Sequence, residues 1–537
     1  DPRESLANRP EWTHVFIDRT ERMFQRDKNH ACIIAWSLGN ESGSGINFLA
    51  TYKWLKAHDL SQRPIHSEDA GKKEFTDIYC PMYKQIDVLI NHVLSRPDKP
   101  LILCEYAHAM GNAVGNLKEY WDAIESSKLG IGGCIWDFVD QSIYDAADIK
   151  QGKLTANGFP KYMTGYDYPG PHQGNFVNNG LISADRAWSP ELAQVKQIYQ
   201  YVKFGAFDQA NKTIEVRNAY NFTDLQKYNL KYTILEDGRE VETHTVALPS
   251  ILPGTSEQCQ VPFSTEIQKG KEYLLNAQIV LKEATSWAEA GYPIAAYQMN
   301  LQAYSGVLPT AEADVTRPLT CEQDEKGNYV ISNDKVSYTF AAEDGRLTNW
   351  KYGRMVLLNN DLNKAFDYAN YRWVENDAAS GDDSGGGATG PDAPVANGIS
   401  KRQIVSEPTV ETDGSVRLTV RNEGSLCNVQ YTYTLYPTGV MDLSMRYNPR
   451  AKDLRRIGTR VILPSSLTNV EYYARGPWDN FVDRSDASFL GRYMTTAVDM
   501  YEPTPRPQTC GNRTDMRELI LSDNKSDFHL RVEATNN

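Results

Sequence analysis

The sequence predicts a multidomain protein that combines α/β and all-β regions. We expect a partial (β/α)8 barrel, then an immunoglobulin-like β-sandwich, then a large β-sandwich. Three observations support this: apolar strand-like runs alternate with helical segments from Trp12 to about residue 185, glutamates follow two of those runs, and alternating strands dominate after Pro190. A chain of 537 residues is long enough for about three or four domains.

Composition excludes several classes of protein. The formal net charge of −13 argues against nucleic-acid binding, which needs clustered Lys and Arg. No apolar stretch approaches the roughly 20 residues of a membrane span, and the first residues do not resemble a signal peptide. We therefore expect no nucleic-acid or membrane partner, while the compartment stays open between cytoplasm and periplasm.

The eight cysteines are scattered without CxxC spacing, which argues against a zinc site or a disulfide framework. The first four lie in apolar, strand-like runs, where we expect reduced thiols packed as small hydrophobes: Cys32, Cys80, Cys104 and Cys134.

Residues 1–188 are predicted to form the second part of the barrel. Continuously apolar runs of this kind are typical of strands buried in a parallel sheet. Five strands are expected, fewer than the eight of a closed barrel, so an open doubly wound sheet is the alternative. The absence of a glycine-rich phosphate turn and the polar residues after strand ends favour a barrel whose first strands precede residue 1. The expected strands are Cys32–Leu38, Pro64–Glu68, Asp77–Tyr83, Pro100–Cys104 and Gly133–Val139, and the expected helices are Trp12–Arg26, 46–57, 86–94 and 117–124.

Two all-β regions are predicted after the barrel. Alternating strands over 189–305 predict the immunoglobulin-like sandwich, and residues 306–318 a linker. Residues 319–537 are expected to form a large sandwich that is incomplete at its end, with a Gly-, Asp- and Pro-rich loop at 378–398. The expected strands are Phe204–Arg217, Tyr228–Leu235, Val241–Leu248, Tyr273–Val280, Tyr329–Ile331, Val336–Phe340, Val416–Arg421, Val429–Leu435, Met441–Tyr447, Thr459–Leu463 and Phe528–Val532.

Glu41 and Glu105 are the candidate catalytic residues. Each follows a buried strand, in the strings Trp36–Ser42 and Leu103–Asn112. Two carboxylates at the ends of strands in one sheet can hydrolyse a glycosidic bond, one as acid/base and one as nucleophile. On residue types alone, Glu41 and Glu105 could also be ordinary surface residues or helix N-terminal charges, and this alternative stays open.

Four strings resemble the catalytic-domain motifs of the large bacterial β-galactosidases of glycoside hydrolase family 2: Trp36–Ser42, Asp77–Tyr83, Leu103–Asn112 and Gly133–Gln141. The string Tyr106–Asn112 is specific to the galactosidases of this family. Further resemblance extends through the rest of the chain, at Thr285–Gly291, Gly476–Asn480 with Asp483 and Arg484, and Asp499–Tyr501.

This resemblance implies a role for each matching residue. Glu41 would be the acid/base and Glu105 the nucleophile, with Tyr83 hydrogen-bonded to Glu105. The sugar would contact Asn40, Met82, Tyr83, His108, Trp136 and Asn179. The family also binds Mg²⁺ and Na⁺. Glu41 would supply one Mg²⁺ ligand, and the Phe176 carbonyl and Asn179 would hold Na⁺, the remaining ligands being expected before residue 1.

The resemblance therefore predicts a retaining β-galactosidase that acts on lactose or galacto-oligosaccharides. One alternative is a non-catalytic or inactive fragment whose sandwiches bind carbohydrate or a partner. Another is a different family-2 β-glycosidase, such as a glucuronidase or mannosidase. The oligomeric state is open, with a homo-oligomer as one option.

Overall fold

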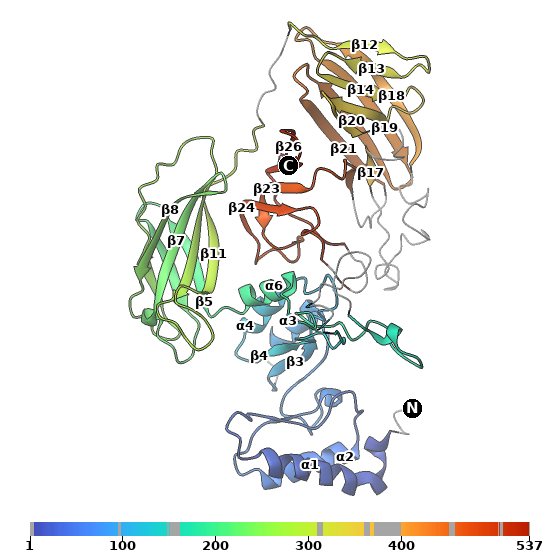
Figure 1. Ribbon diagram of the computed structural model, residues 1–537. Helices are drawn as coiled ribbons and strands as arrows, with labels where there is room; N and C mark the ends of the chain where they lie inside the picture. Colours follow the sequence, from blue (N-terminus) through green and yellow to red (C-terminus); the bar gives the residue numbers. More distant parts are fainter. Residues whose placement is uncertain are drawn as a thin grey trace.

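The computed structural model describes residues 5–94, 98–145, 147, 150, 162–308, 315–358, 366–369, 399–450, 457–502, 504 and 509–535. The predicted loop at 378–398 and the middle of the predicted linker lie outside these ranges. Figure 1 shows the N-terminal helices and the parallel strands toward one end of the molecule and the large β region at the other. The small sandwich (green) lies to one side. Within the described ranges, no helix is long and apolar enough to cross a membrane.

Two helices that the sequence predicts, α1 (Thr13–Asp27) and α2 (Ile46–His58), pack on each other at the N-terminal end. Helix α1 is amphipathic, whereas α2 buries both polar and apolar residues. Phe24 and Leu55 from these helices share one core with Trp36 and Ile65. The indole Nε1 of the buried Trp36 donates to Asp59 Oδ2 at 2.9 Å, which satisfies its polar atom.

The barrel strands form a parallel ladder in sequence order. Strand β1 (Trp36–Ser37) pairs with β2 (Ile65–His66), and β3 (Leu101–Tyr106) pairs with β4 (Gly130–Ile135). The segment between these pairs connects them, because Asp77 N donates to Ile65 O at 2.7 Å and Tyr79 bridges Leu101 in parallel. Val139 then bridges Ile182. The carboxyl ends of all these segments therefore lie on one edge.

Apart from β3, the regular strands of the barrel region are shorter than predicted. Only two residues of the expected strand Cys32–Leu38 pair in β1, and β4 ends at Ile135 rather than Val139. The expectation that Cys32 and Cys134 pack as buried thiols is wrong, since both are exposed. Cys32 lies in the turn that follows α1, before β1 begins, and thus outside the apolar ladder.

Three further helices cover the ladder: α3 (Ile86–Leu94), α4 (Leu117–Glu125) and α6 (Pro190–Ile198). Helix α6 begins where Ser189 Oγ accepts from Leu192 N at 3.1 Å and Pro190 fills the first helical position. Its Val195 and Ile198 share a core with Leu101 and Leu103 of β3. By packing, the barrel region thus includes α6, which the predicted boundary after residue 188 leaves out.

The small sandwich has two antiparallel sheets, ordered β11-β10-β7-β8 and β5-β6-β9. Their inward residues form a single core that includes Val216, Leu230 and Leu275, as expected for seven strands of the immunoglobulin type. The expected single strand Phe204–Arg217 is instead a hairpin of two. The strands are β5 (Val202–Asp208), β6 (Thr213–Asn218), β7 (Tyr228–Glu236), β8 (Arg239–Ala247), β9 (Ser256–Gln260), β10 (Tyr273–Leu281) and β11 (Pro293–Gln302).

The large β region contains two packed sheets and a separate C-terminal sheet. The sheets β12-β13-β14-β15-β16 and β18-β19-β20-β21 bury residues such as Tyr338, Phe340, Leu418 and Tyr433 between them. The remaining pair is β17-β22. The strands are β12 (Thr320–Gln323), β13 (Tyr329–Ser332), β14 (Val336–Phe340), β15 (Leu347–Tyr352), β16 (Met355–Leu358), β17 (Phe366–Ala369), β18 (Ile399–Val410), β19 (Val416–Gly424), β20 (Cys427–Leu435), β21 (Met441–Pro449) and β22 (Gly458–Val461).

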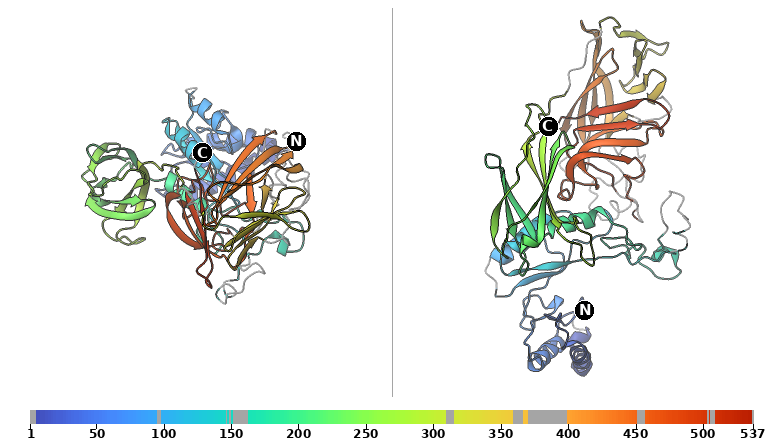
Figure 2. Two further views of the ribbon diagram at one scale, coloured as in Figure 1. Left: turned by 90° about the horizontal axis from the view of Figure 1, so that it is seen from above. Right: turned by 60° about the vertical axis from the view of Figure 1, so that its left-hand side comes forward.

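The C-terminal sheet has the order β24-β23-β25-β26 and lies between the other parts in Figures 1 and 2. Its strands are β23 (Asn469–Gly476), β24 (Phe489–Thr496), β25 (Glu518–Ser522) and β26 (His529–Glu533). It contacts the small sandwich through Leu490, which packs on Leu235 and Leu274. The amide of Gln298 exchanges two hydrogen bonds with the Leu490 backbone, at 2.7 and 2.8 Å.

A buried ion pair strengthens this contact. Arg517 of the C-terminal sheet region donates from Nε and Nη2 to both carboxylate oxygens of Glu272, at 3.1 and 3.0 Å. Tyr473 OH also donates to Glu272, which is only 1% exposed. A carboxylate buried this deeply is tolerated only because charged and hydroxyl donors surround it.

We expect Glu272→Ala to lower the free energy of unfolding by about 3–5 kcal/mol, because it leaves the Arg517 charge buried and unpaired. The matched control is Asp18→Ala, which breaks an exposed ion pair with Arg22 (2.9 Å), where solvent screening leaves little net stabilisation. Differential scanning calorimetry compares the two. A Glu272→Ala effect as small as that of the control would contradict the prediction.

Candidate active site

Strained backbone marks the carboxyl edge of the ladder. Three non-glycine residues there have left-handed backbone: Glu41 (φ 47°), Tyr83 (φ 45°) and Ala107 (φ 49°). This conformation costs on the order of 1 kcal/mol or more per residue and is concentrated at functional sites. Each of the three lies just after a strand-like segment, on the edge where barrel chemistry is found.

Tyr83 and Glu105 are held together by backbone and side chain. Met82 forms a parallel bridge with Glu105, and Tyr83 N donates to Glu105 O at 2.9 Å. This register brings Tyr83 OH to Glu105 Oε2, to which it donates at 3.1 Å. Burial is the main cause that raises the pKa of Tyr83 well above its usual value, and the hydrogen bond to Glu105 is the second. The charge of Glu41 raises this pKa further. Both candidate carboxylates therefore raise the pKa of the Tyr83 phenol.

His108 lies near Tyr83 and Phe176. Its ring lies 6.2 Å from that of Tyr83 and 5.6 Å from that of Phe176, between centroids. Burial lowers the pKa of His108 below its ordinary value, against the opposing charges of Asp137 and Glu105. The imidazole is therefore neutral at pH 7, so one ring nitrogen donates and the other accepts.

Backbone bonds connect the next strand end to Asn179. Ala109 N donates to Trp136 O at 2.8 Å, and Asp137 N donates to Asn179 O at 2.7 Å. Asn179 is 2% exposed, and its Nδ2 donates to Phe176 O at 2.6 Å. Within the described part of the chain, Asn179 Oδ1 is buried without a hydrogen-bond partner.

Glu41 lies beside a carboxylate that sequence reasoning missed. Its backbone N–H points to Glu68 Oε2 at 3.3 Å, and Gly43 N donates to Asp69 Oδ2 at 2.6 Å. Burial and the neighbouring Asp69 raise the pKa of Glu68. Glu68 ends the predicted strand Pro64–Glu68, so the strand-end rule that selected Glu41 also points to it. Asn40 is exposed, and its carbonyl accepts from Ser42 Oγ at 2.7 Å.

The predicted metal ligands are all oxygen atoms. In the described ranges, no group of three His, Cys, Asp or Glu side chains could hold a metal ion. The Phe176 carbonyl and the unpartnered Oδ1 of Asn179 are both oxygen donors, as a hard cation such as Na⁺ requires.

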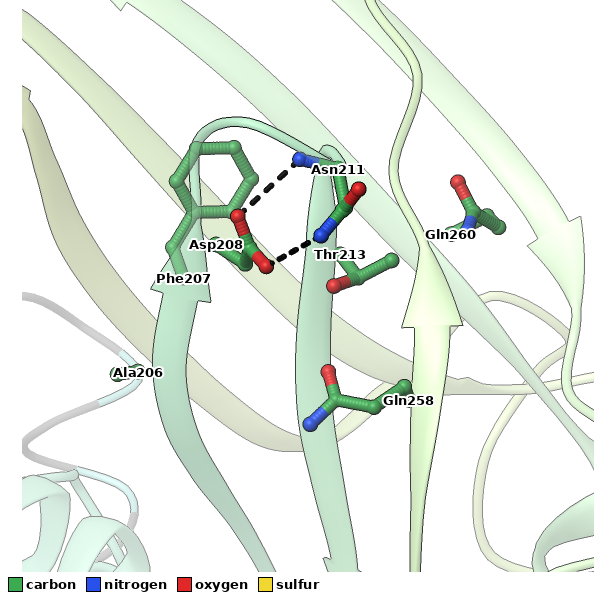
Figure 3. Close-up of a pocket in the computed structure, with 7 residues that line it drawn as sticks. All are labelled: Ala206, Phe207, Asp208, Asn211, Thr213, Gln258 and Gln260. Atoms are coloured by element: carbon green, nitrogen blue, oxygen red, sulfur yellow. Dashed lines mark hydrogen bonds between the residues drawn. The ribbon is translucent and has the colours of Figure 1, made fainter.

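A hollow of about 570 Å³ lies elsewhere, on the small sandwich (Figure 3). Its lining includes amide side chains and one carboxylate, Asp208. The backbone N and the side-chain Nδ2 of Asn211 donate hydrogen bonds to that carboxylate, at 3.1 and 2.7 Å. A hollow with one carboxylate, itself used in a turn, cannot supply the pair that glycoside hydrolysis needs.

We expect Glu105→Gln to lower the pKa of Tyr83, because the substitution removes the negative charge that disfavours the phenolate. The resonance of ¹³Cζ-labelled Tyr83, assigned with Tyr83→Phe, reports this pKa in a pH titration. Glu242→Gln, which changes a carboxylate in β8 of the small sandwich, is the control and should leave it unmoved. An unchanged Tyr83 pKa in Glu105→Gln would contradict an effect of the Glu105 charge on this phenol.

Three family models match the chain in succession. Residues 2–204 match "Glycosyl hydrolases family 2, TIM barrel domain", residues 214–302 match "Beta-galactosidase, domain 4", and residues 332–536 match "Beta galactosidase small chain". They follow the order of the barrel region, the small sandwich and the large β region described above.

Curated relatives match along almost the whole chain. The beta-galactosidase of Priestia megaterium is 32% identical over 531 residues, which are 97% of this chain and 49% of that protein. The beta-galactosidase of Vibrio cholerae is 30% identical over 548 residues, 96% of this chain and 51% of that protein. A solved structure, an FMN-binding beta-glucuronidase from Facaelibacterium prausnitzii, is 14% identical with a TM-score of 0.27, covering 54% of this chain and 44% of that one.

The chain spans about half the length of the curated relatives it matches. Its barrel region, its small sandwich and its large β region each match a family model of glycosyl hydrolases or β-galactosidases. The chain thus belongs to glycoside hydrolase family 2, and the relatives that match most of it are named beta-galactosidases.

Proposed function

We propose that the protein hydrolyses terminal non-reducing β-D-galactose residues of β-galactosides such as lactose, with retention of configuration. The observation that supports this best is the Tyr83–Glu105 hydrogen bond of 3.1 Å at the edge where Glu41 also lies. The relatives that match most of the chain are named beta-galactosidases.

In the first step, Glu105 attacks the anomeric carbon and the glycosidic C–O bond breaks. Glu41 gives its proton to the leaving oxygen, so a galactosyl–Glu105 ester forms as the aglycone departs. Tyr83 OH donates to Glu105 Oε2, which orients the carboxylate and leaves its other oxygen for attack. In the second step, Glu41 takes a proton from water, and the water oxygen replaces Glu105 at the anomeric carbon.

The surrounding residues would bind the sugar. The neutral imidazole of His108 can both donate to and accept from hydroxyl groups. The half-buried indole of Trp136 would stack on the apolar face of galactose, with Asn40 and Met82 completing the contacts. Na⁺ at the Phe176 carbonyl and Asn179 Oδ1 would supply a positive charge beside a sugar hydroxyl. Glu41 would contribute one ligand to Mg²⁺.

We expect a 2-fluoro-galactoside with a good leaving group to label Glu105, since the fluorine slows release of the ester. Peptide mapping by mass spectrometry locates the label. Glu105→Gln should abolish it, and Tyr83→Phe should slow labelling by roughly 10- to 100-fold, in proportion to a lost charge-assisted hydrogen bond of about 1.5–3 kcal/mol. Tyr297→Phe, a partly exposed phenol in β11, is the control.

A label on any residue other than Glu105 would contradict the assignment of the nucleophile. Preferential labelling by the matched 2-fluoro-glucuronide or 2-fluoro-mannoside would show that the enzyme acts on that sugar instead of galactose. No label from any of these reagents would favour a non-catalytic role for the chain.

A further inference from the structure

The loop that follows Glu105 needs support from outside the barrel. Between Ala107 and Asn116, four residues have left-handed backbone: Ala107 (φ 49°), Gly111 (φ 68°), Val114 (φ 62°) and Asn116 (φ 55°). Three of them carry side chains, so this loop, which also contains His108, is strained unless its surroundings fix it. On the barrel side, Ala109 N bonds Trp136 O, and Ala109 and Val114 are buried in the barrel core.

On the other side, the loop is held by the C-terminal sheet region. Arg484 Nη2 donates to Asn112 Oδ1 at 2.8 Å, and Asn112 Nδ2 donates to Thr509 O at 2.9 Å. Asn116 N donates to Asp483 O at 2.8 Å. At Gly115, an added Cβ would lie 2.1 Å from Asp483 Oδ2, so the two loops approach as closely as a glycine allows.

Arg484 is fixed on its own side by buried charges. Its side chain is 3% exposed, and it forms ion pairs of 2.7 Å with both Glu191 of α6 and Asp479. The Asp479 carboxylate also accepts from Gly511 N at 3.0 Å. Because the planar guanidinium reaches Glu191, Asp479 and Asn112 at once, its direction is determined, and a lysine could not reproduce it.

We propose that Arg484 is a positioning residue that holds the loop after Glu105 through Asn112, and thereby orients His108 and Glu105 for reaction. The junction between the barrel and the C-terminal sheet is then part of the active-site support. The catalytic part of this inference rests on the proposed function, whereas the support of the loop does not.

The test uses Asn112→Ala, which removes the contact but leaves the Arg484 ion pairs intact, alongside Arg484→Lys. Arg513→Met is the matched control: Arg513 belongs to the same sheet region and bonds Tyr472 OH (3.0 Å) and Pro477 O (2.8 Å), on its own side of the junction. Hydrogen exchange of peptides spanning 106–117, measured without any sugar, reports the loop. The rate of Glu105 labelling by the 2-fluoro-galactoside, split into binding and chemical steps, reports the catalytic consequence.

We expect roughly fivefold faster exchange of the loop in Arg484→Lys, as for the loss of about one hydrogen bond, and a larger increase in Asn112→Ala, which also loses the bond to Thr509 O. The control should be unchanged. The chemical step of labelling should slow by a similar factor, with little change in binding. Unchanged exchange in both variants would overturn the support of the loop. Faster exchange with an unchanged chemical step would overturn the positioning role. If the unsubstituted protein is not labelled at Glu105, the proposed function fails, and the exchange data still decide whether Arg484 holds the loop.

Discussion

The parallel register between the segment at Tyr79–Tyr83 and strand β3 is the constraint on which the candidate site depends. Tyr79 bridges Leu101 and Met82 bridges Glu105. This register places the Tyr83 hydroxyl within hydrogen-bond distance of Glu105. A slip of one residue would turn every side chain of the segment to the opposite face. The same ladder continues through Trp136 and Asn179, which is why residues from the four motif strings and from the segment around Asn179 lie at one edge.

Helix α6 and the C-terminal sheet region join this edge to the rest of the molecule. One face of α6 packs into the barrel core through Val195 and Ile198. Its Gln197 donates to Ala296 O of the small sandwich at 2.8 Å, and its Gln194 donates to Asp486 at 2.7 Å. The two hydrogen bonds are partly buried and specific in geometry. They therefore fix the relative placement of the domains rather than simply adding apolar area.

Local sequence predicted the elements whose pattern is strong and local. Helices α1 and α2 lie within one residue of their predicted bounds, and strands β19 and β20 follow from strict alternation that matches their buried residues. It did not identify β9, which is polar in four of its five residues and pairs only with β6 at the edge of its sheet. The bond between Arg484 and Asn112 joins residues 372 apart in sequence, and no local pattern encodes it. For the site, the strand-end rule selected Glu41 and Glu105 and could have selected Glu68, whereas the unpartnered Asn179 oxygen is visible only in three dimensions.

The stereochemistry of azide rescue distinguishes Glu105 as nucleophile from Glu41 as acid/base. In Glu105→Gly, azide would attack the anomeric carbon from the face the nucleophile normally uses, so an α-galactosyl azide is expected from an activated β-galactoside. In Glu41→Gly, azide would replace water in the second step, and a β-galactosyl azide is expected. A β product from Glu105→Gly, or an α product from Glu41→Gly, would overturn the assignment of the two carboxylates.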